Sequence, residues 1–196
     1  MKIKDTIHEA LINRGKIHSK RDIIRLMKEY EEKFALKIRS NMIKYLSRHN
    51  YIRRIFLGYY YINSYDERIR RFCEYEDKEV LFMVLNKLNI KWYVGLAHSK
   101  YLQGKIWQIP NQIQIINTKF SGSKKIFGLK VHFFKTKEKL FFGLKKIKTK
   151  HNVEYFYSDP AKTYLDEVYF GESGNLIRIK HTQTYLKRYP KWVGKK

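Results

Sequence analysis

The segment Ser40–Ile62, with the sequence SNMIKYLSRHNYIRRIFLGYYYI, decides the fold of the first third of the chain. Its first half has the apolar spacing of a short helix that begins at Ser40. Its second half consists of two β-prone runs around Gly58, a residue that can adopt the positive φ angle of a tight turn. The segment therefore predicts a helix followed by a β-hairpin, whose first strand carries Arg53 and Arg54.

The predicted helix has two different faces. At about 100° per residue, its polar and basic side chains fall on one side: Asn41, Lys44, Tyr45 and Arg48. The other side is apolar and consists of Met42, Ile43 and Leu46. A helix divided in this way packs on a core through one face and presents a basic, hydrogen-bonding face to the solvent.

Two more helices and a short strand are predicted before Ser40. The first helix has apolar residues from Ile3 to Leu11 on one face and ends at Gly15. Lys16–His18 is a short strand, and Ser19 begins the next helix with the Ser-Lys-Arg-Asp spacing of a capping box. Helix, strand, helix, helix and hairpin is the order of a winged helix-turn-helix, whose third helix enters the major groove of DNA.

A basic helix face also has a simpler interpretation, because such faces are often only solvated. The order of the elements and the arginine-bearing hairpin together favour nucleic-acid binding. Asn41 and Arg48 then suit base recognition, since Asn pairs with adenine and Arg with guanine. Tyr45 has two open roles. One is a DNA contact, to a phosphate or to a thymine methyl group, and the other is packing against the wing, which is the predicted hairpin. Phosphate contacts are expected from Arg39, Lys44, Arg53 and Arg54.

The polar stretch Asn63–Glu67 separates this region from the rest of the chain. We therefore expect two domains, residues 1–65 and residues 66–196. Beyond the boundary, helices are predicted at 77–88 and 92–104, and a third begins at Ser158. The strand-like runs are 106–109, 112–116, 127–134, 139–147 and 153–157. Because helices do not alternate with the central strands, the pattern predicts an α+β domain with a mostly antiparallel sheet.

The chain of 196 residues is strongly basic. It has 42 Lys and Arg residues against 18 Asp and Glu, a formal charge of +24, which indicates a polyanionic partner. Much of the excess lies in the tract Lys124–Lys150, where Glu138 is the only acid, and whether this tract contacts DNA, RNA or protein is left open. Membrane-spanning and secretory segments are not expected, so the predicted location is the cytoplasm. The lone Cys73 excludes an internal disulfide and a multi-cysteine zinc site.

Three motifs in order give a family resemblance. They are Tyr51–Arg54 with the later Gly58-Tyr59-Tyr60, Tyr93–His98 followed by Gly104, and Tyr157–Asp166 with the sequence YSDPAKTYLD. With these motifs the chain resembles the AbiEi family, antitoxins and predicted transcriptional regulators of prokaryotic viral-defence loci. The most specific part is the third motif, which contains Asp159, Lys162, Thr163 and Asp166.

The resemblance implies two activities. An N-terminal winged helix would repress its own operon by binding inverted repeats in double-stranded DNA. The C-terminal antitoxin domain would counteract a nucleotidyltransferase-type toxin, with or without a stable complex. We expect a monomer or weak dimer that requires no cofactor.

Two alternatives to this regulator remain. Asp159, Lys162 and Asp166 suggest a metal-dependent nuclease, since carboxylates and a lysine can hold Mg²⁺ and a phosphate. Capping by Asp159 and an i, i+4 pair between Lys162 and Asp166 explain the same residues without catalysis. We therefore predict a protein that is not an enzyme and has no catalytic or metal site. The other alternative is a winged-helix RNA-binding protein, because the lysines and sixteen tyrosines suit unpaired bases.

Overall fold

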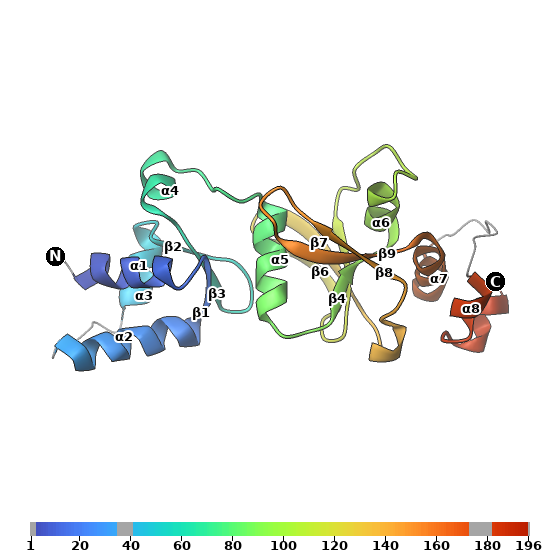
Figure 1. Cartoon of the computed structure of the whole chain (residues 1–196), viewed down its shortest axis with the longest axis horizontal. Coiled ribbons are helices and arrows are strands. Elements are labelled where there is room, and N and C mark those ends of the chain that lie inside the picture. The colour runs from blue at the N-terminus through green and yellow to red at the C-terminus, as the bar shows by residue number, and fades with distance from the viewer. Residues whose placement is uncertain (1–2, 35–40, 173–181, 196) are drawn as a thin grey trace. The chain divides into compact units, whose positions relative to one another are not determined.

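The computed structural model describes residues 3–34, 41–172 and 182–195, and it has an α+β fold (Figure 1). The chain divides into two compact units, Met1–Lys87 and Leu88–Lys196. A three-stranded antiparallel sheet belongs to the first unit and a six-stranded mixed sheet to the second. Among the described residues, no helix has both the length and the apolar character needed to cross a membrane.

The first unit has the predicted order of helix, strand, helix, helix and hairpin. Its elements are α1 (Ile3–Asn13), β1 (Ile17–Ser19), α2 (Lys20–Phe34), α3 (Met42–Arg48), β2 (Ile52–Arg54), β3 (Tyr59–Ile62), α4 (Tyr65–Arg70) and α5 (Asp77–Lys87). Strand β3 lies between β1 and β2, and Ile17 faces Tyr61 across the ladder. This pairing ties the hairpin to the segment between the first two helices.

Local signals in the sequence account for several ends of these elements. Ser40, predicted to begin the third helix, lies outside the described residues, and the N-cap of α3 is Asn41. The predicted capping box at Ser19 is confirmed, since the Asp22 N–H donates to Ser19 Oγ over 3.2 Å and Ser19 N–H donates to the Asp22 carboxylate over 3.1 Å. Gly58 ends the hairpin turn with a φ of +77°, as the sequence predicts. One apolar core joins α1, α2, α3 and the hairpin through Ile7, Leu11, Ile23, Leu26, Leu46, Ile52 and Ile62.

The first unit extends beyond the predicted domain boundary at residue 65. Ser64 caps α4 in a capping box with Glu67, whose carboxylate is buried. Lys16 Nζ, from the start of β1, donates to that carboxylate over 2.8 Å, and Tyr61 also donates to it. Helix α4 is therefore fastened to the small sheet, and the division falls after Lys87 instead of after Tyr65.

The second unit is built on one sheet. Its elements are β4 (Trp92–Val94), α6 (Leu96–Leu102), β5 (Ile113–Asn117), β6 (Gly122–Ile126), β7 (Leu129–Lys135), η1 (Glu138–Leu140), β8 (Leu144–Lys148), β9 (Glu154–Ser158), α7 (Pro160–Phe170), α8 (Thr182–Leu186) and η2 (Lys191–Lys195). The strand order is β6-β7-β5-β4-β9-β8. The β5–β7 and β4–β9 pairs are parallel and the other three are antiparallel, so the sheet is mixed with antiparallel pairs in the majority.

Three sequence predictions in this unit are wrong. The run 139–147, predicted as a strand, begins with the 3-10 helix η1, and strand β8 starts only at Leu144. The predicted helix at 92–104 begins only at Leu96, because Trp92–Val94 is a strand held between β5 and β9. Gly95 joins the two elements, and a Cβ there would lie 2.4 Å from the Ile116 Cδ1 atom, so a larger residue would require the Ile116 side chain to shift. The run 106–109 is a loop, since no strand of the sheet pairs with it.

Candidate nucleic-acid interface

Helix α3 presents the predicted polar stripe to the solvent. Asn41, at the N-cap, and Lys44 and Arg48 within the helix are exposed. On the opposite face Met42 and Leu46 are buried in the core of the first unit. A spacing of three and four residues aligns the three polar side chains along one face, so they can contact one surface together.

Tyr45 is engaged inside the fold. Its hydroxyl accepts a hydrogen bond of 2.9 Å from Lys4 Nζ, and its ring lies 4.2 Å from the His49 ring. The side chain is half-buried and packs on the core of the first unit. Of the two roles left open by the sequence, packing therefore has the structural support, although the packing partners are α1 and the turn after α3.

The two hairpin arginines differ in their surroundings. Arg54 is exposed at the end of β2, whereas Arg53 is half-buried. Arg53 Nε donates to Asn63 Oδ1 over 3.0 Å, and its guanidinium lies 5.4 Å from the centre of the Tyr61 ring. Arg54 is thus available to a phosphate, while Arg53 also holds the end of the hairpin. Arg39 lies outside the described residues.

The C-terminal motif forms a cap and a buried network. Asp159 caps α7 by accepting the Lys162 N–H over 2.8 Å, with Pro160 in the first turn, so the predicted cap is confirmed. The i, i+4 ion pair between Lys162 and Asp166 is also confirmed. The side chains of this pair are 0% and 1% exposed, so it lies in the interior and not on a solvated helix face.

Two tyrosines that sequence reasoning missed complete the network. Lys162 Nζ donates to the hydroxyls of Tyr93 over 2.8 Å and Tyr189 over 2.6 Å. Both hydroxyls donate in turn to the Asp166 carboxylate, over 2.9 Å and 2.6 Å. The ammonium also lies 5.1 Å from the ring centres of Tyr93, Tyr189 and Phe142. These contacts satisfy both buried charges.

The network perturbs the protonation of its members. Burial lowers the pKa of Lys162 and raises the pKa of Asp166, and the ion pair between them opposes both shifts. Burial and the Asp166 charge raise the pKa of Tyr93 and Tyr189, which keeps their hydroxyls protonated as donors. Because both charges are enclosed, loss of either partner would leave the other charge buried and unpaired.

Thr163 belongs to a second hydrogen-bonded group beside the first. Its Oγ1 lies 2.6 Å from Ser158 Oγ and accepts from Gln103 Nε2 over 2.9 Å. Ser158 Oγ donates to Ser99 Oγ over 2.9 Å, so α6, β9 and α7 are joined through small polar side chains. The conspicuous polar residues of the motif therefore hold helices on the sheet. Within residues 3–34, 41–172 and 182–195, no three His, Cys, Asp or Glu side chains are grouped closely enough to hold a metal ion.

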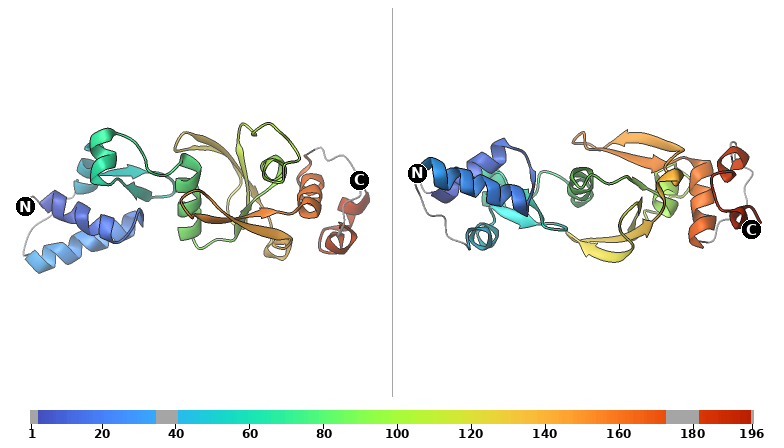
Figure 2. Two further views of the ribbon diagram at one scale, coloured as in Figure 1. Left: turned by 45° about the horizontal axis from the view of Figure 1, so that its top comes forward. Right: turned by 90° about the horizontal axis from the view of Figure 1, so that it is seen from below.

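Half of the lysines in the lysine-rich tract lie on the two edge strands of the sheet. Lys124 and Lys125 lie on the edge strand β6, whereas Lys145, Lys146 and Lys148 lie on the other edge strand, β8. Figure 2 shows the β6–β7 hairpin (yellow) and the β8–β9 hairpin (orange) at opposite sides of the sheet. Five strand spacings separate the edges by about 24 Å. Lysines on edge strands prevent pairing with other chains, which explains part of the positive charge without a ligand.

Comparisons with known proteins add no further assignment. No family model matches the chain, and no curated protein matches its sequence.

Proposed function

We propose that this chain is a DNA-binding transcriptional regulator whose first unit is a winged helix-turn-helix. One observation carries the proposal: α3 packs on the core through Met42 and Leu46 while it presents Asn41, Lys44 and Arg48 outward, directly before the β2–β3 hairpin. The third helix of a winged helix-turn-helix is the one that enters the major groove.

Each exposed side chain has a role that its chemistry suits. Asn41 and Arg48 bind base edges, because an amide matches adenine and a guanidinium matches guanine. Lys44 and Arg54 neutralise phosphates and fix the orientation of the helix. Arg53 contributes positive charge near the backbone but also holds Asn63, so its role is shared between binding and folding.

The resemblance to AbiEi antitoxins supplies the biological setting of the proposal. The regulator represses its own operon at inverted repeats, and the second unit counteracts a nucleotidyltransferase-type toxin without enzymatic activity. The motif Asp159–Asp166 supports this by building the interior of the second unit. Its lysine and second aspartate are enclosed by tyrosines, which favours a scaffold over a nuclease centre.

Arg48→Ala should weaken binding to the specific operator by about 1–3 kcal/mol, the contribution of one bidentate base contact. Binding to unrelated duplex should change much less, because that binding depends on phosphates. Gel retardation of both duplexes by the full-length variant measures the two effects. Arg70→Ala, which removes an exposed arginine from α4, is the matched control. An equal loss on both duplexes would remove Arg48 from base recognition.

Arg54→Ala should weaken binding to all duplexes alike and reduce the slope of log affinity against log salt by about 0.9. Arg53→Ala should reduce the slope too, but it should also lower stability because Asn63 loses its guanidinium donor. Retardation titrations at several salt concentrations, together with thermal unfolding, separate the two arginines. An Arg54→Ala variant with an unchanged slope would show that the hairpin does not contact phosphate.

A further inference from the structure

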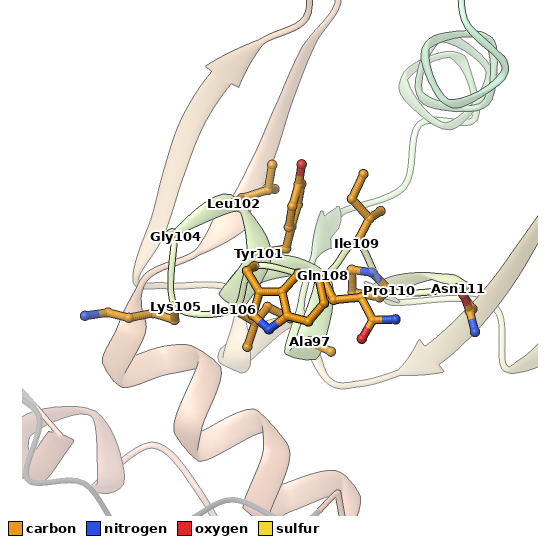
Figure 3. A pocket seen from close by; sticks show the side chains of 11 residues that line it. Ala97, Tyr101, Leu102, Gly104, Lys105, Ile106, Gln108, Ile109, Pro110 and Asn111 are labelled. Carbon is orange, nitrogen blue, oxygen red and sulfur yellow. The ribbon is translucent and has the colours of Figure 1, made fainter.

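A large hollow lies beside the loop between α6 and β5. Its volume is about 1080 Å³. Its lining includes Tyr101, Lys105, Trp107, Gln108, Ile109 and Asn111. Figure 3 shows Tyr101, Leu102 and Ile109 on the same side of the loop, with Lys105 and Asn111 toward its two ends. All of these residues belong to the second unit, so the hollow is independent of α3.

The loop exposes side chains that proteins normally cover. Trp107 is 91% exposed and Ile109 is 60% exposed, and they are two residues apart on the same hollow. Single exposed apolar residues are common, but a fully exposed indole beside a second large apolar group marks a contact site. The other two tryptophans are more covered, since Trp92 is buried in the sheet and Trp192 stacks on Tyr169.

The charge around the hollow indicates what covers it. No carboxylate is among its lining residues, whereas Lys105 is. The whole stretch Leu88–Lys137, which contains the loop, has nine lysines and no Asp or Glu. A surface with this charge attracts an anionic partner and disfavours a cationic one.

We propose that this hollow binds single-stranded nucleic acid. The Trp107 indole offers a flat face on which an unpaired base can stack, and Tyr101 offers a second aromatic ring in the same hollow. Lys105 neutralises a phosphate, and the side-chain amides of Gln108 and Asn111 donate to and accept from base edges. Paired bases in a duplex are stacked inside the helix, so this surface selects unpaired strands.

An acidic protein segment is the competing partner, because the aliphatic residues of the hollow also suit protein side chains. The nucleic-acid assignment is favoured by the planar ring of Trp107, which is almost fully exposed, and by the two side-chain amides of the same hollow. Aliphatic anchors alone would require neither feature. An acidic polypeptide would compete with an acidic protein partner for this hollow but not with a stacked nucleic-acid base. Competition experiments can therefore separate the two kinds of partner.

The test uses the full-length protein and a fluorescein-labelled oligothymidylate of about 12 nucleotides, a length within the usual range of such sites. Binding is followed by anisotropy and by quenching of tryptophan emission. We expect Trp107→Ala to weaken binding about 5- to 100-fold and to abolish most of the quenching. In Trp107→Phe the affinity should recover in part, because a phenyl ring can still stack on a base, whereas the quenching should stay lost. Phe156→Ala, which removes an exposed aromatic ring of β9 outside the hollow, should bind like the wild type.

Two results would overturn the inference. One is unchanged affinity and quenching in Trp107→Ala. The other is displacement of the oligothymidylate by polyglutamate at equal charge, which would indicate charge attraction or an acidic protein partner. Arg48→Ala should weaken operator binding and leave oligothymidylate binding unchanged. Trp107→Ala should have the opposite effect, so each variant tests one of the two proposals separately.

Discussion

Replacing Asp166 by Asn is expected to destabilise the second unit by about 3–5 kcal/mol, because it leaves a buried ammonium without its counter-charge. Lys162 is fully buried, and every contact that remained to it, including the hydroxyls of Tyr93 and Tyr189, would be with an uncharged group. Those hydroxyls would lose the carboxylate that accepts their hydrogen bonds. Few single substitutions have an effect of this size.

The loss of stability in Asp166→Asn can be measured for the second unit alone. All three tryptophans, Trp92, Trp107 and Trp192, lie after Leu88, so tryptophan fluorescence during urea unfolding reports on that unit alone. In the double variant Lys162→Met/Asp166→Asn the unpaired charge is absent, and we expect part of the stability to return. A loss below about 1 kcal/mol in Asp166→Asn would contradict the buried network, since it is less than a typical unpaired buried polar group costs.

The second large effect is expected at Glu67, in the first unit. Burial alone would raise its pKa, but hydrogen bonds from the Glu74 N–H, Lys16, Tyr61 and the Ser64 N–H lower the pKa to about 2 from its ordinary 4.5. A carboxyl group whose pKa is lower in the folded state stabilises the fold above its unfolded pKa. The contribution is about 3 kcal/mol, present above about pH 4.5 and lost as the pH falls toward about 2.

Glu67→Gln should remove this pH-dependent contribution and should already weaken the first unit at neutral pH by a similar amount. Hydrogen exchange of the β3 and α4 amides in the full-length protein reports on this unit. Glu32→Gln, at an exposed position of α2, provides a control that keeps the wild-type pH profile. If Glu67→Gln and Glu32→Gln lose protection from hydrogen exchange in parallel as the pH falls, the Glu67 carboxylate does not stabilise the contact between α4 and the sheet.

The parts of the fold that local chemistry dictates could be predicted from the sequence. The turn at Gly58, the capping box at Ser19 and the cap at Asp159 depend on residues within a few positions of one another. The Lys162–Asp166 pair is of the same kind, since it needs only the helical spacing of four residues. Each of these predictions agrees with the structure.

The parts that failed depend on contacts between distant segments. Tyr93 lies 69 residues before Lys162 and Tyr189 lies 27 residues after it, so nothing local signals that the ion pair is buried. Lys16 contacts Glu67 across 51 residues, which places α4 in the first unit. The parallel β4–β9 and β5–β7 pairs likewise join strands that are separated along the chain.

The candidate sites too could be predicted only where a local pattern in the sequence signals them. The stripe on α3 follows from helical periodicity, and its exposed members are those that the spacing predicts, apart from the half-buried Tyr45. The Trp107 loop had no such signal, because its apolar residues resemble a buried strand in the sequence. In the structure no strand pairs with this loop, and the indole of Trp107 is exposed.

Sequence-specific DNA binding is the central claim, and one measurement tests it most directly. The full-length protein is titrated by gel retardation against the DNA upstream of its own gene and against an unrelated duplex of equal length, at about 0.15 M salt. We expect binding at least about 1000-fold tighter to the upstream DNA, with the difference strongly reduced in the variant Asn41→Ala/Arg48→Ala. Equal affinity for both duplexes would contradict the assignment of α3 as a recognition helix.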